Sequence, residues 1–237
     1  MKNKTALITG ASKGIGFAIA EELVKEDINV CITARNKDDL ENAAKKLNQL
    51  NSGRAIAVYC DVKDYQSQID AMKTTVEQFG GLDYLIANAG VGHFAAVEDL
   101  SIEQWHEVID TNLTGVFYSV KAALEELTRT KGYIITISSL AGKNTFAGGS
   151  AYNASKFGLN GFSEAIMLDL RYKGIEVTTI MPGSVSSYFN NRSPEEGKDW
   201  RIQPEDIGQM VVNLLKMPAR TLPSRVEVRP SIPNRKK

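Results

Sequence analysis

The sequence predicts an α/β fold in which one parallel, doubly wound sheet extends through a single domain, residues 1–237. Three observations lead to this prediction. Short apolar segments alternate with longer amphipathic segments along the chain. Most of the short segments are continuously apolar, which is typical of parallel strands buried on both faces. A glycine-rich turn, TGASKGIG at 9–16, joins the first short segment to the first long one, as in Rossmann-type domains.

Each element follows from its local pattern. Segments that are short and apolar are predicted to be strands: 5–9, 29–34, 54–60, 82–88, 132–138, 175–181 and 225–229. Segments with helical periodicity are predicted to be helices: 14–26, 38–50, 64–79, a long helix that begins after Ser101, 151–172 and 204–216. Ser101 and Gln104 have the spacing of a capping box. The polar stretch around 184–203 fits neither pattern and is predicted to be a mobile substrate lid.

Composition excludes several classes of protein. The 28 basic residues balance 28 acidic ones, so no general attraction to nucleic acid or acidic membranes is expected. No apolar run approaches the roughly 18 residues of a membrane helix, and the N-terminal residues do not resemble a signal peptide. Cys31 and Cys60 lie in apolar segments and are expected to be reduced core residues. The two histidines lack matching ligands, so no metal site is predicted, and a cytoplasmic location is expected.

The glycine-rich turn predicts a phosphate site. Gly10 permits a tight turn, Gly14 lets the backbone approach a phosphate, and Gly16 lets the helix pack close to the sheet. The helix N-terminus then presents free N–H groups and a partial positive charge to a pyrophosphate. A purely structural turn is the alternative, and three glycines within eight residues make it the weaker one.

The residues around the second predicted strand favour NADP over NAD. A site for NAD places an acid at the end of this strand to hold the ribose 2′-hydroxyl. Here Ala34 occupies that place and Arg35 follows it, while Lys13 adds a second cation inside the glycine loop. Two cations and no acid favour a 2′-phosphate.

Tyr152 and Lys156 stand four residues apart in a predicted helix, so both side chains lie on one face. A free tyrosine has a pKa of about 10, and a nearby cation lowers it by favouring the phenolate. We therefore expect Lys156 to lower the pKa of Tyr152, so that the phenol exchanges a proton with a substrate oxygen. A surface Tyr–Lys contact is the alternative for this pair taken alone.

Further motifs accompany this pair in a fixed order: NAG at 88–90, Asn112, ISS at 137–139, YNASK at 152–156 and PG at 182–183. In this combination the chain resembles the short-chain dehydrogenase/reductase (SDR) family, from residue 5 to about residue 215. The resemblance implies four catalytic residues. Ser139 would hydrogen-bond the carbonyl oxygen and Tyr152 would deliver the proton. Lys156 would also hold the nicotinamide ribose, and Asn112 would anchor a water that relays protons.

The glycine loop and the resemblance together predict the contacts to NADP(H): Gly10, Ser12, Lys13, Gly14, Ile15, Gly16, Arg35, Asp61, Val62, Asn88, Ala89, Gly90, Tyr152, Lys156, Pro182, Gly183, Val185 and Ser187. By resemblance, Asp61 and Val62 would contact the adenine. Gly183, Val185 and Ser187 would meet the nicotinamide carboxamide.

The predicted function is NADP-dependent hydride transfer between nicotinamide and a small-molecule carbonyl or secondary alcohol. The chain resembles 3-oxoacyl-carrier-protein reductases and also broad-specificity carbonyl or hydroxy-acid members, but it ends in RVEVRPSIPNRKK rather than in V-D/N-G-G, so the substrate stays open. His93 and Phe94 are candidates to line the pocket, and a loop histidine without a role is the alternative for His93. The competing function is a non-catalytic NADP-binding redox sensor. An epimerase or dehydratase fits less well, because no second domain is predicted.

A homo-oligomer, dimer or tetramer, is also expected. The helix that carries Tyr152 is apolar nearly all round, with Phe157, Phe162 and Leu168 among its apolar residues. Such a helix needs cover on two sides. One side would pack on the sheet and the other on a second copy of the chain.

Overall fold

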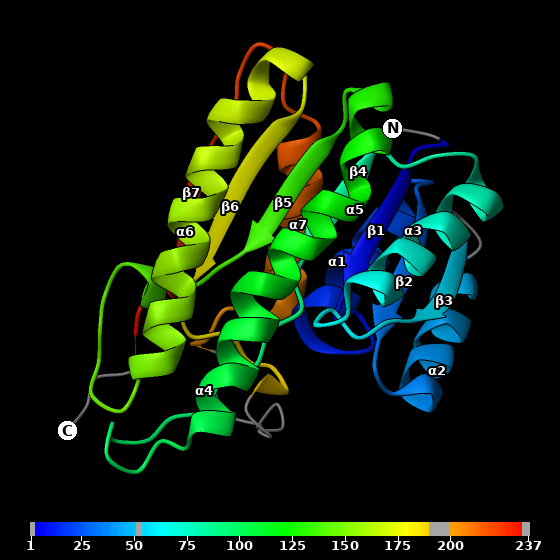
Figure 1. Cartoon of the computed structure of the whole chain (residues 1–237). Helices are drawn as coiled ribbons and strands as arrows, with labels where there is room; N and C mark the ends of the chain where they lie inside the picture. Colours follow the sequence, from blue (N-terminus) through cyan, green and yellow to red (C-terminus); the bar gives the residue numbers. More distant parts are fainter. Residues whose placement is uncertain (1–2, 51–53, 190–199, 234–237) are drawn as a thin grey trace.

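A computed structural model describes residues 3–50, 54–189 and 200–233. In this part of the chain the strands form one parallel seven-stranded sheet with the order β3-β2-β1-β4-β5-β6-β7 (Figure 1). The strands are β1 (Thr5–Thr9), β2 (Asn29–Ala34), β3 (Ala55–Tyr59), β4 (Tyr84–Ala87), β5 (Tyr133–Ile137), β6 (Glu176–Pro182) and β7 (Arg225–Val228). The predicted parallel α/β sheet is thereby confirmed.

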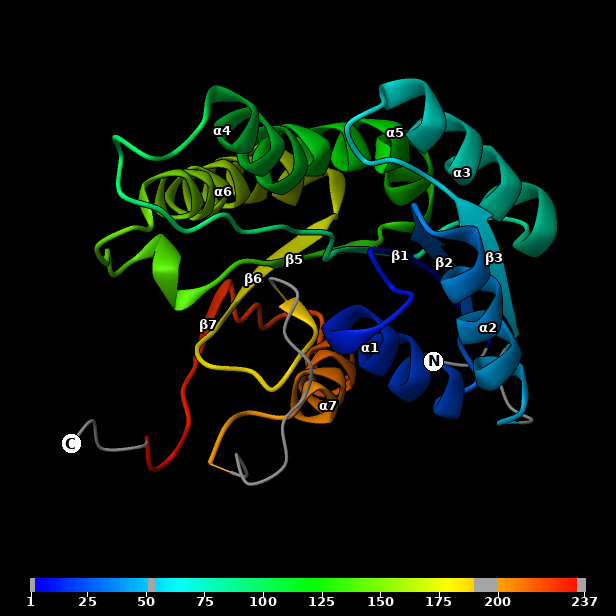
Figure 2. The same cartoon turned by 90° about the horizontal axis from the view of Figure 1, so that it is seen from below.

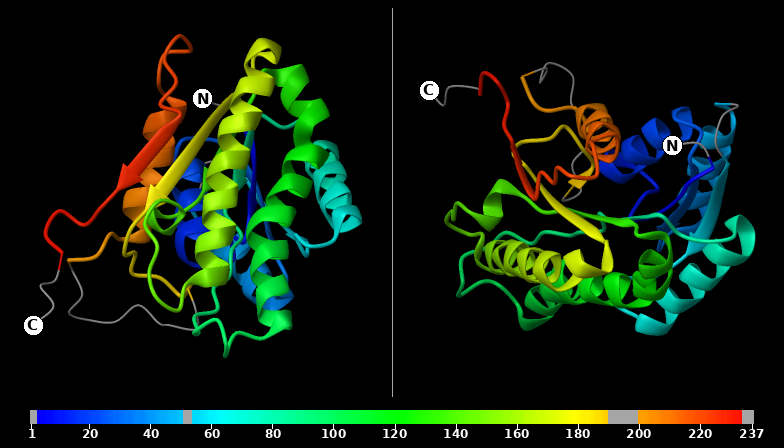
Figure 3. Two further views of the ribbon diagram at one scale, coloured as in Figure 1. Left: turned by 60° about the vertical axis from the view of Figure 1, so that its left-hand side comes forward. Right: turned by 90° about the horizontal axis from the view of Figure 1, so that it is seen from above.

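Helices cover both faces of this sheet. The long helices are α1 (Gly14–Lys25), α2 (Lys37–Asn48), α3 (Tyr65–Phe79), α4 (Ile102–Ile109), α5 (Gly115–Thr130), α6 (Ser150–Leu170) and α7 (Pro204–Leu215). Figure 2 shows α1, α2 and α7 on one side of the sheet and α3, α4, α5 and α6 on the other. The views in Figure 3 show the same two layers. Every residue of β1 and β5 is buried, as expected for strands covered on both faces.

The capping box and the long helix predicted after Ser101 are both found in the structure. Ser101 and Gln104 form the expected capping box at the start of α4. The long helix predicted after Ser101 is present: α4, a π-helical turn (Asp110–Thr114) and α5 follow one another without a break, with helical backbone at both junctions. Single π-helical turns of this kind are rare and are frequent at functional sites.

The parallel arrangement brings the carboxyl ends of the strands to one edge of the sheet. The residues that follow β1, β2, β4, β5 and β6 at this edge are Gly10, Arg35, Asn88, Ser138 and Gly183. The strand order reverses between β1 and β4, and open α/β sheets bind ligands at such a switch point.

The predicted lid is described only at its two ends, since residues 190–199 lie outside the described residues. Val185 and Ile202 form a parallel bridge. Around it, the Ser186 N–H donates to the carbonyl of Ile202 at 2.9 Å, and the Ile202 N–H donates to the carbonyl of Ser184 at 3.1 Å. Both ends of the segment are therefore anchored beside the carboxyl edge of the sheet.

Candidate active site

Tyr152 and Lys156 lie in the first two turns of α6, beside the end of β5. Lys156 is 4% exposed, and its Nζ donates to the carbonyl of Ile137 at 3.0 Å. The same Nζ lies 5.8 Å from the centroid of the Tyr152 ring. A buried ammonium held by a strand-end carbonyl is not a surface contact, so the surface alternative for this pair is excluded.

The pKa values at this pair are set mainly by burial. Burial raises the pKa of Tyr152, and a hydrogen bond with Ser139 offsets part of that rise. Burial lowers the pKa of Lys156 to about 8. The net direction for Tyr152 is thus upward, and the predicted lowering of its pKa by Lys156 stays a prediction.

Ser139, and not Ser138, faces the tyrosine. The Ser138 hydroxyl is buried and donates to Oδ1 of Asn160 at 2.6 Å, which satisfies it away from the site. Ser139 lies just beyond β5, where its Oγ accepts from the Ala141 N–H at 3.1 Å and donates weakly to the carbonyl of Pro182 at 3.4 Å. Its hydroxyl is thus positioned between the end of β6 and Tyr152.

Asn112 occupies the centre of the π-helical turn and is fully buried. Its Oδ1 accepts from the Val91 N–H at 2.8 Å, and its Nδ2 donates to the carbonyl of Val91 at 2.9 Å and to Ser155 Oγ at 3.0 Å. Asn112 therefore ties the loop after β4 to α6. The water-anchoring role stays a prediction, and both Nδ2 donors are already engaged.

The glycine loop has the shape of a phosphate cradle. Gly10 and Gly14 have φ values of 65° and 62°, a left-handed conformation that favours glycine. A Cβ on Gly10 would lie 2.8 Å from Cα of Ala89, and one on Gly16 would lie 2.6 Å from the carbonyl oxygen of Gly10. No side chain caps the N-terminus of α1, and its first turn holds no acid. The loop thus fits a pyrophosphate.

The segment after β4 is tied to this cradle. Asn88 Nδ2 donates to the carbonyls of Thr9 and Gly10, both at 2.9 Å. Thr9 Oγ1 accepts from the N–H groups of Asn88 and Ala89 at 3.0 and 3.1 Å. A Cβ on Gly90 would lie 3.8 Å from Nζ of Lys156, so this segment connects the cradle with Lys156. Thr9 was not among the predicted site residues.

The two predicted phosphate cations lie at this edge of the sheet, each beside another side chain. Arg35, directly after β2, has its guanidinium 3.9 Å from a carboxylate oxygen of Glu107, and the Arg35 side chain is half exposed. Lys13 Nζ lies 5.5 Å from the centroid of the Tyr188 ring. Glu107 also hydrogen-bonds His93 Nε2 at 2.7 Å, and this contact is the main cause that lowers the pKa of Glu107.

The remaining predicted contacts lie on the surrounding loops. Asp61 Oδ1 accepts from the Lys63 N–H at 3.0 Å, in the turn after β3. Val62 is buried next to Gly115, where a Cβ would lie 3.0 Å from Cγ2 of Val62. Ser187 faces the cradle from the opposite side, because a Cβ on Gly14 would lie 3.7 Å from Cβ of Ser187.

The other predicted contacts, Ser12, Ile15, Pro182, Gly183 and Val185, lie in the same strand-end loops and the first turn of α1. Pro182 ends β6, and the N–H of Gly183 donates to the carbonyl of Val228 at 2.8 Å. The predicted cofactor residues and the four predicted catalytic residues therefore lie around the carboxyl edge of the sheet.

Sequence reasoning missed two parts of this site. Glu107 lies on α4 as one acid among several, and nothing in its local sequence marks it. Phe146 and Phe189 have ring centroids 5.7 and 6.4 Å from that of Phe94. The only signal for Phe189 is that Tyr188 and Phe189 interrupt an otherwise polar segment.

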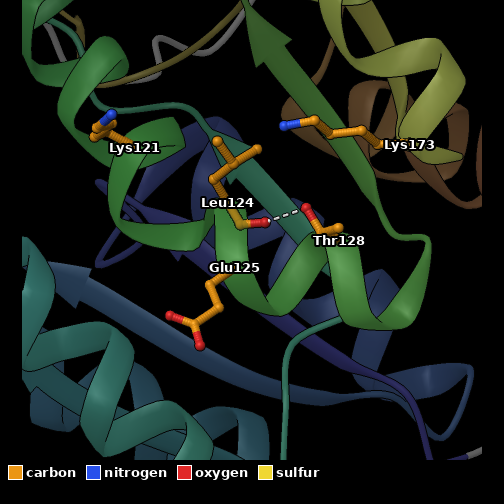
Figure 4. Close-up of a pocket in the computed structure, with 5 residues that line it drawn as sticks. All are labelled: Lys121, Leu124, Glu125, Thr128 and Lys173. Atoms are coloured by element: carbon orange, nitrogen blue, oxygen red, sulfur yellow. Dashed lines mark hydrogen bonds between the residues drawn. The ribbon is translucent and has the colours of Figure 1, made fainter.

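A hollow of about 420 Å³ lies elsewhere, between α5 and the turn that follows α6 (Figure 4). Its lining residues are Lys121, Leu124, Glu125, Thr128 and Lys173. The Thr128 hydroxyl donates to the carbonyl of Leu124 at 2.7 Å, so it is already satisfied. None of these residues belongs to the predicted site.

In the described part of the chain, no three or more His, Cys, Asp and Glu side chains are grouped so that they could hold a metal ion. None of the helices described is long and apolar enough to span a membrane.

Replacing Lys156 with methionine is expected to remove a pH dependence of stability. The folded-state pKa of about 8 lies below the reference value of 10.5, so the folded protein releases this proton first as the pH rises. Wild-type protein should therefore gain about 1 kcal/mol of unfolding free energy between about pH 7 and pH 9, relative to the variant. Urea unfolding of both proteins at the two pH values measures this gain. An equal difference at both pH values would show that the lysine is solvated.

The sequence is similar to a known family over most of its length and to curated relatives over nearly its whole length. A family profile described as short chain dehydrogenase matches residues 4–198. An uncharacterized oxidoreductase of Staphylococcus aureus (strain MW2) is 32% identical over 232 residues, which cover 97% of this chain and 98% of the relative. Another, of Staphylococcus saprophyticus, is 29% identical over 231 residues, which cover 97% of this chain and 98% of that protein.

Two solved structures superpose closely on this chain. An alcohol dehydrogenase from the archaeon Thermococcus sibiricus, complexed with 5-hydroxy-NADP, has a TM-score of 0.92 at 31% identity and covers 99% of both chains. An actinorhodin polyketide ketoreductase with NADPH has a TM-score of 0.87 at 31% identity and covers 96% of both chains.

Proposed function

The chain belongs to the short chain dehydrogenase family, and on this premise we propose that it is an NADP(H)-dependent oxidoreductase for carbonyl compounds and secondary alcohols. One observation carries the proposal. Ser139, Tyr152 and the buried Lys156 meet at the end of β5, next to a glycine cradle that fits a pyrophosphate. A redox sensor has no use for this catalytic set, so the sensor alternative is not favoured.

The roles of these residues follow from their chemistry. Bound NADPH would supply the hydride, and the protein has to manage the charge that develops on the substrate oxygen. Ser139 would donate a hydrogen bond to that oxygen, in the manner of an oxyanion hole. Tyr152 would deliver a proton to it as the general acid. Lys156 would hold positive charge beside the phenol, and Asn112 keeps the loop after β4 in register with α6.

Two observations support NADP(H) over NAD(H). Ala34 stands where a site for NAD has an acid, and the Arg35 guanidinium follows it at the edge of the sheet. The similar alcohol dehydrogenase from Thermococcus sibiricus is complexed with 5-hydroxy-NADP, and the similar actinorhodin polyketide ketoreductase is complexed with NADPH. Glu107 neutralises Arg35 only weakly, because a half-exposed ion pair at 3.9 Å contributes little. A cytoplasmic location remains part of the proposal, and it agrees with Cys31 and Cys60 being free, buried thiols.

The test is oxidation of NADPH, followed by absorbance, with β-ketoacyl thioesters, diketones, quinones and small keto acids as substrates. We expect NADPH to be oxidised with at least one class of carbonyl compound. We expect no oxidation of NADPH when the carbonyl compound is left out. If NADPH binds tightly but no carbonyl in the panel is reduced, the sensor function replaces the proposed one.

We further propose that the chain forms a dimer or tetramer through α5 and α6. The sheet-facing residues of α6 are mostly small or polar, as Asn160 and Ser163 illustrate, while Phe157 and Leu168 are 44% and 52% exposed. On α5, Phe117 is 46% exposed and its ring centroid lies 6.2 Å from that of Phe162 on α6. An apolar outer face on two adjacent helices is what a second copy of the chain would cover.

The variant Leu168→Glu should weaken this association, because it places a charge in an apolar interface. Light scattering at micromolar concentration should give an oligomeric mass for wild type and a lower mass for the variant. A control, Lys45→Glu, makes the same kind of charge change at an exposed residue of α2, in the helix layer on the other side of the sheet. A monomeric mass for wild type would contradict the proposal.

A further inference from the structure

Two phenylalanines border the ring of Tyr152, and a third packs against one of them. Phe94 follows β4, Phe146 precedes α6 and Phe189 follows β6, and we call these three residues the phenylalanine wall. The ring centroids of Phe94 and Phe189 each lie 5.5 Å from that of Tyr152. Phe94 also lies 5.7 Å from Phe146 and 6.4 Å from Phe189. The residue proposed to donate the proton is therefore bordered by apolar rings.

The backbone is built to let these rings meet. A Cβ on Gly92 would lie 2.7 Å from Cζ of Phe189 and 3.0 Å from Cζ of Phe94, so a larger residue there would push the rings apart. The Ala95 N–H donates to the carbonyl of Gly148 at 3.0 Å, which joins the loop after β4 to the loop before α6. The wall is thus held by close packing and by a backbone hydrogen bond.

Two rings of the wall keep a large exposed fraction. Phe94 is 39% exposed and Phe146 is 47% exposed. Grouped around a reactive side chain, exposed rings mark a surface that an apolar ligand completes. They offer no charge and no strong hydrogen bond. A carboxylate or phosphate against them would lose hydration without compensation.

We propose that the phenylalanine wall selects carbonyl substrates with an aromatic or bulky apolar group next to the reacting carbonyl. The inference rests on the proposed function, because it places the carbonyl oxygen at Ser139 and Tyr152. A substituent on the carbonyl carbon then lies beside the rings that border Tyr152. Aromatic contacts of this kind change affinity by roughly two- to twelve-fold per ring. Small keto acids gain nothing from the wall.

Three substrates that differ in one group test this selection: 1-phenyl-1,2-propanedione, 2,3-butanedione and pyruvate. With NADPH, kcat/KM should be highest for the phenyl diketone and lowest for the keto acid. Phe94→Leu and Phe189→Leu should each lower the phenyl-to-methyl ratio of kcat/KM by roughly two- to twelve-fold. The matched control is Phe79→Leu, at the C-terminal end of α3 and so at the opposite edge of the sheet, which should leave the ratio unchanged.

A binding measurement separates failure of this inference from failure of the proposed function. Calorimetric titration of 1-phenylethanol into the NADP⁺-loaded protein needs no turnover, and the two wall variants should weaken binding by the same factor. Binding that depends on the wall, with no reduction of any substrate, would support the selection and contradict the oxidoreductase. Equal kcat/KM for the two diketones, a preference for pyruvate, or ratios unchanged in both wall variants would overturn the selection. Absence of both turnover and 1-phenylethanol binding would also overturn it.

Discussion

Replacement of Tyr152 with phenylalanine is expected to lower kcat for carbonyl reduction by about 10²- to 10⁴-fold, the usual contribution of a general acid. The variant keeps the ring, and with it the contacts to Phe94 and Phe189 at 5.5 Å, so that only the hydroxyl is lost. NADPH affinity should stay within a few fold, because the phenol's proton serves the chemistry more than it serves binding. Stopped-flow single turnover measures the rate, and fluorescence titration measures the affinity.

Tyr133→Phe is the matched control for this variant. The Tyr133 hydroxyl is buried in β5, shares a hydrogen bond of 2.6 Å with Thr178 Oγ1, and burial raises its pKa to about 12. Its loss should lower the free energy of unfolding by about 1 kcal/mol, while kcat stays at the wild-type value. If Tyr152→Phe also keeps a near-wild-type kcat, Tyr152 is not the proton donor.

The directions of the pKa shifts fit reduction better than oxidation at neutral pH. Burial raises the pKa of Tyr152, so the phenol keeps the proton that a carbonyl oxygen requires. Burial lowers the pKa of Lys156 to about 8, which leaves the ammonium mostly charged near pH 7. Both groups therefore carry a proton near pH 7, as the proposed reduction requires.

The parts of the site that follow from local spacing were predictable from the sequence. Tyr152 and Lys156 share a helix face because they are four residues apart, whatever the helix packs against. The parallel sheet followed from continuously apolar segments. The choice of Ser139 came from the family resemblance, and the bond from Ser138 to Asn160 gives a physical reason for it.

The parts that depend on packing were not predictable. The π-helical turn at Asp110–Thr114 has no compositional signature, and it arises where Asn112 reaches Val91. The sign of the Tyr152 pKa shift depends on burial, which spacing alone does not reveal. The phenylalanine wall joins residues from three loops, and only the packed structure brings these loops together.

Arg35→Ala is expected to raise the Kd for NADPH by roughly ten- to a hundred-fold while hardly changing the Kd for NADH, as the loss of a hydrogen bond to a charged group implies. A 2′-phosphate carries about −1.5 to −2 charges if it titrates like other phosphomonoesters. The Arg35 guanidinium can meet it with two parallel N–H groups. The carboxylate of Glu107, at 3.9 Å, is a weaker partner that the phosphate can displace.

Three further variants test whether the charge around Arg35 sets the preference for NADPH over NADH. Ala34→Asp should add to the loss for NADPH and improve NADH binding, because a carboxylate repels the phosphate and accepts from a ribose hydroxyl. Glu107→Gln should act in the opposite direction and tighten NADPH, since it removes the competing anion. Arg54→Ala removes the same charge beside Gln78 and Phe79, at the far edge of the sheet, and should change neither cofactor. Equal weakening of NADPH and NADH by Arg35→Ala, or a wild-type preference for NADH, would mean that Arg35 does not read the 2′-phosphate.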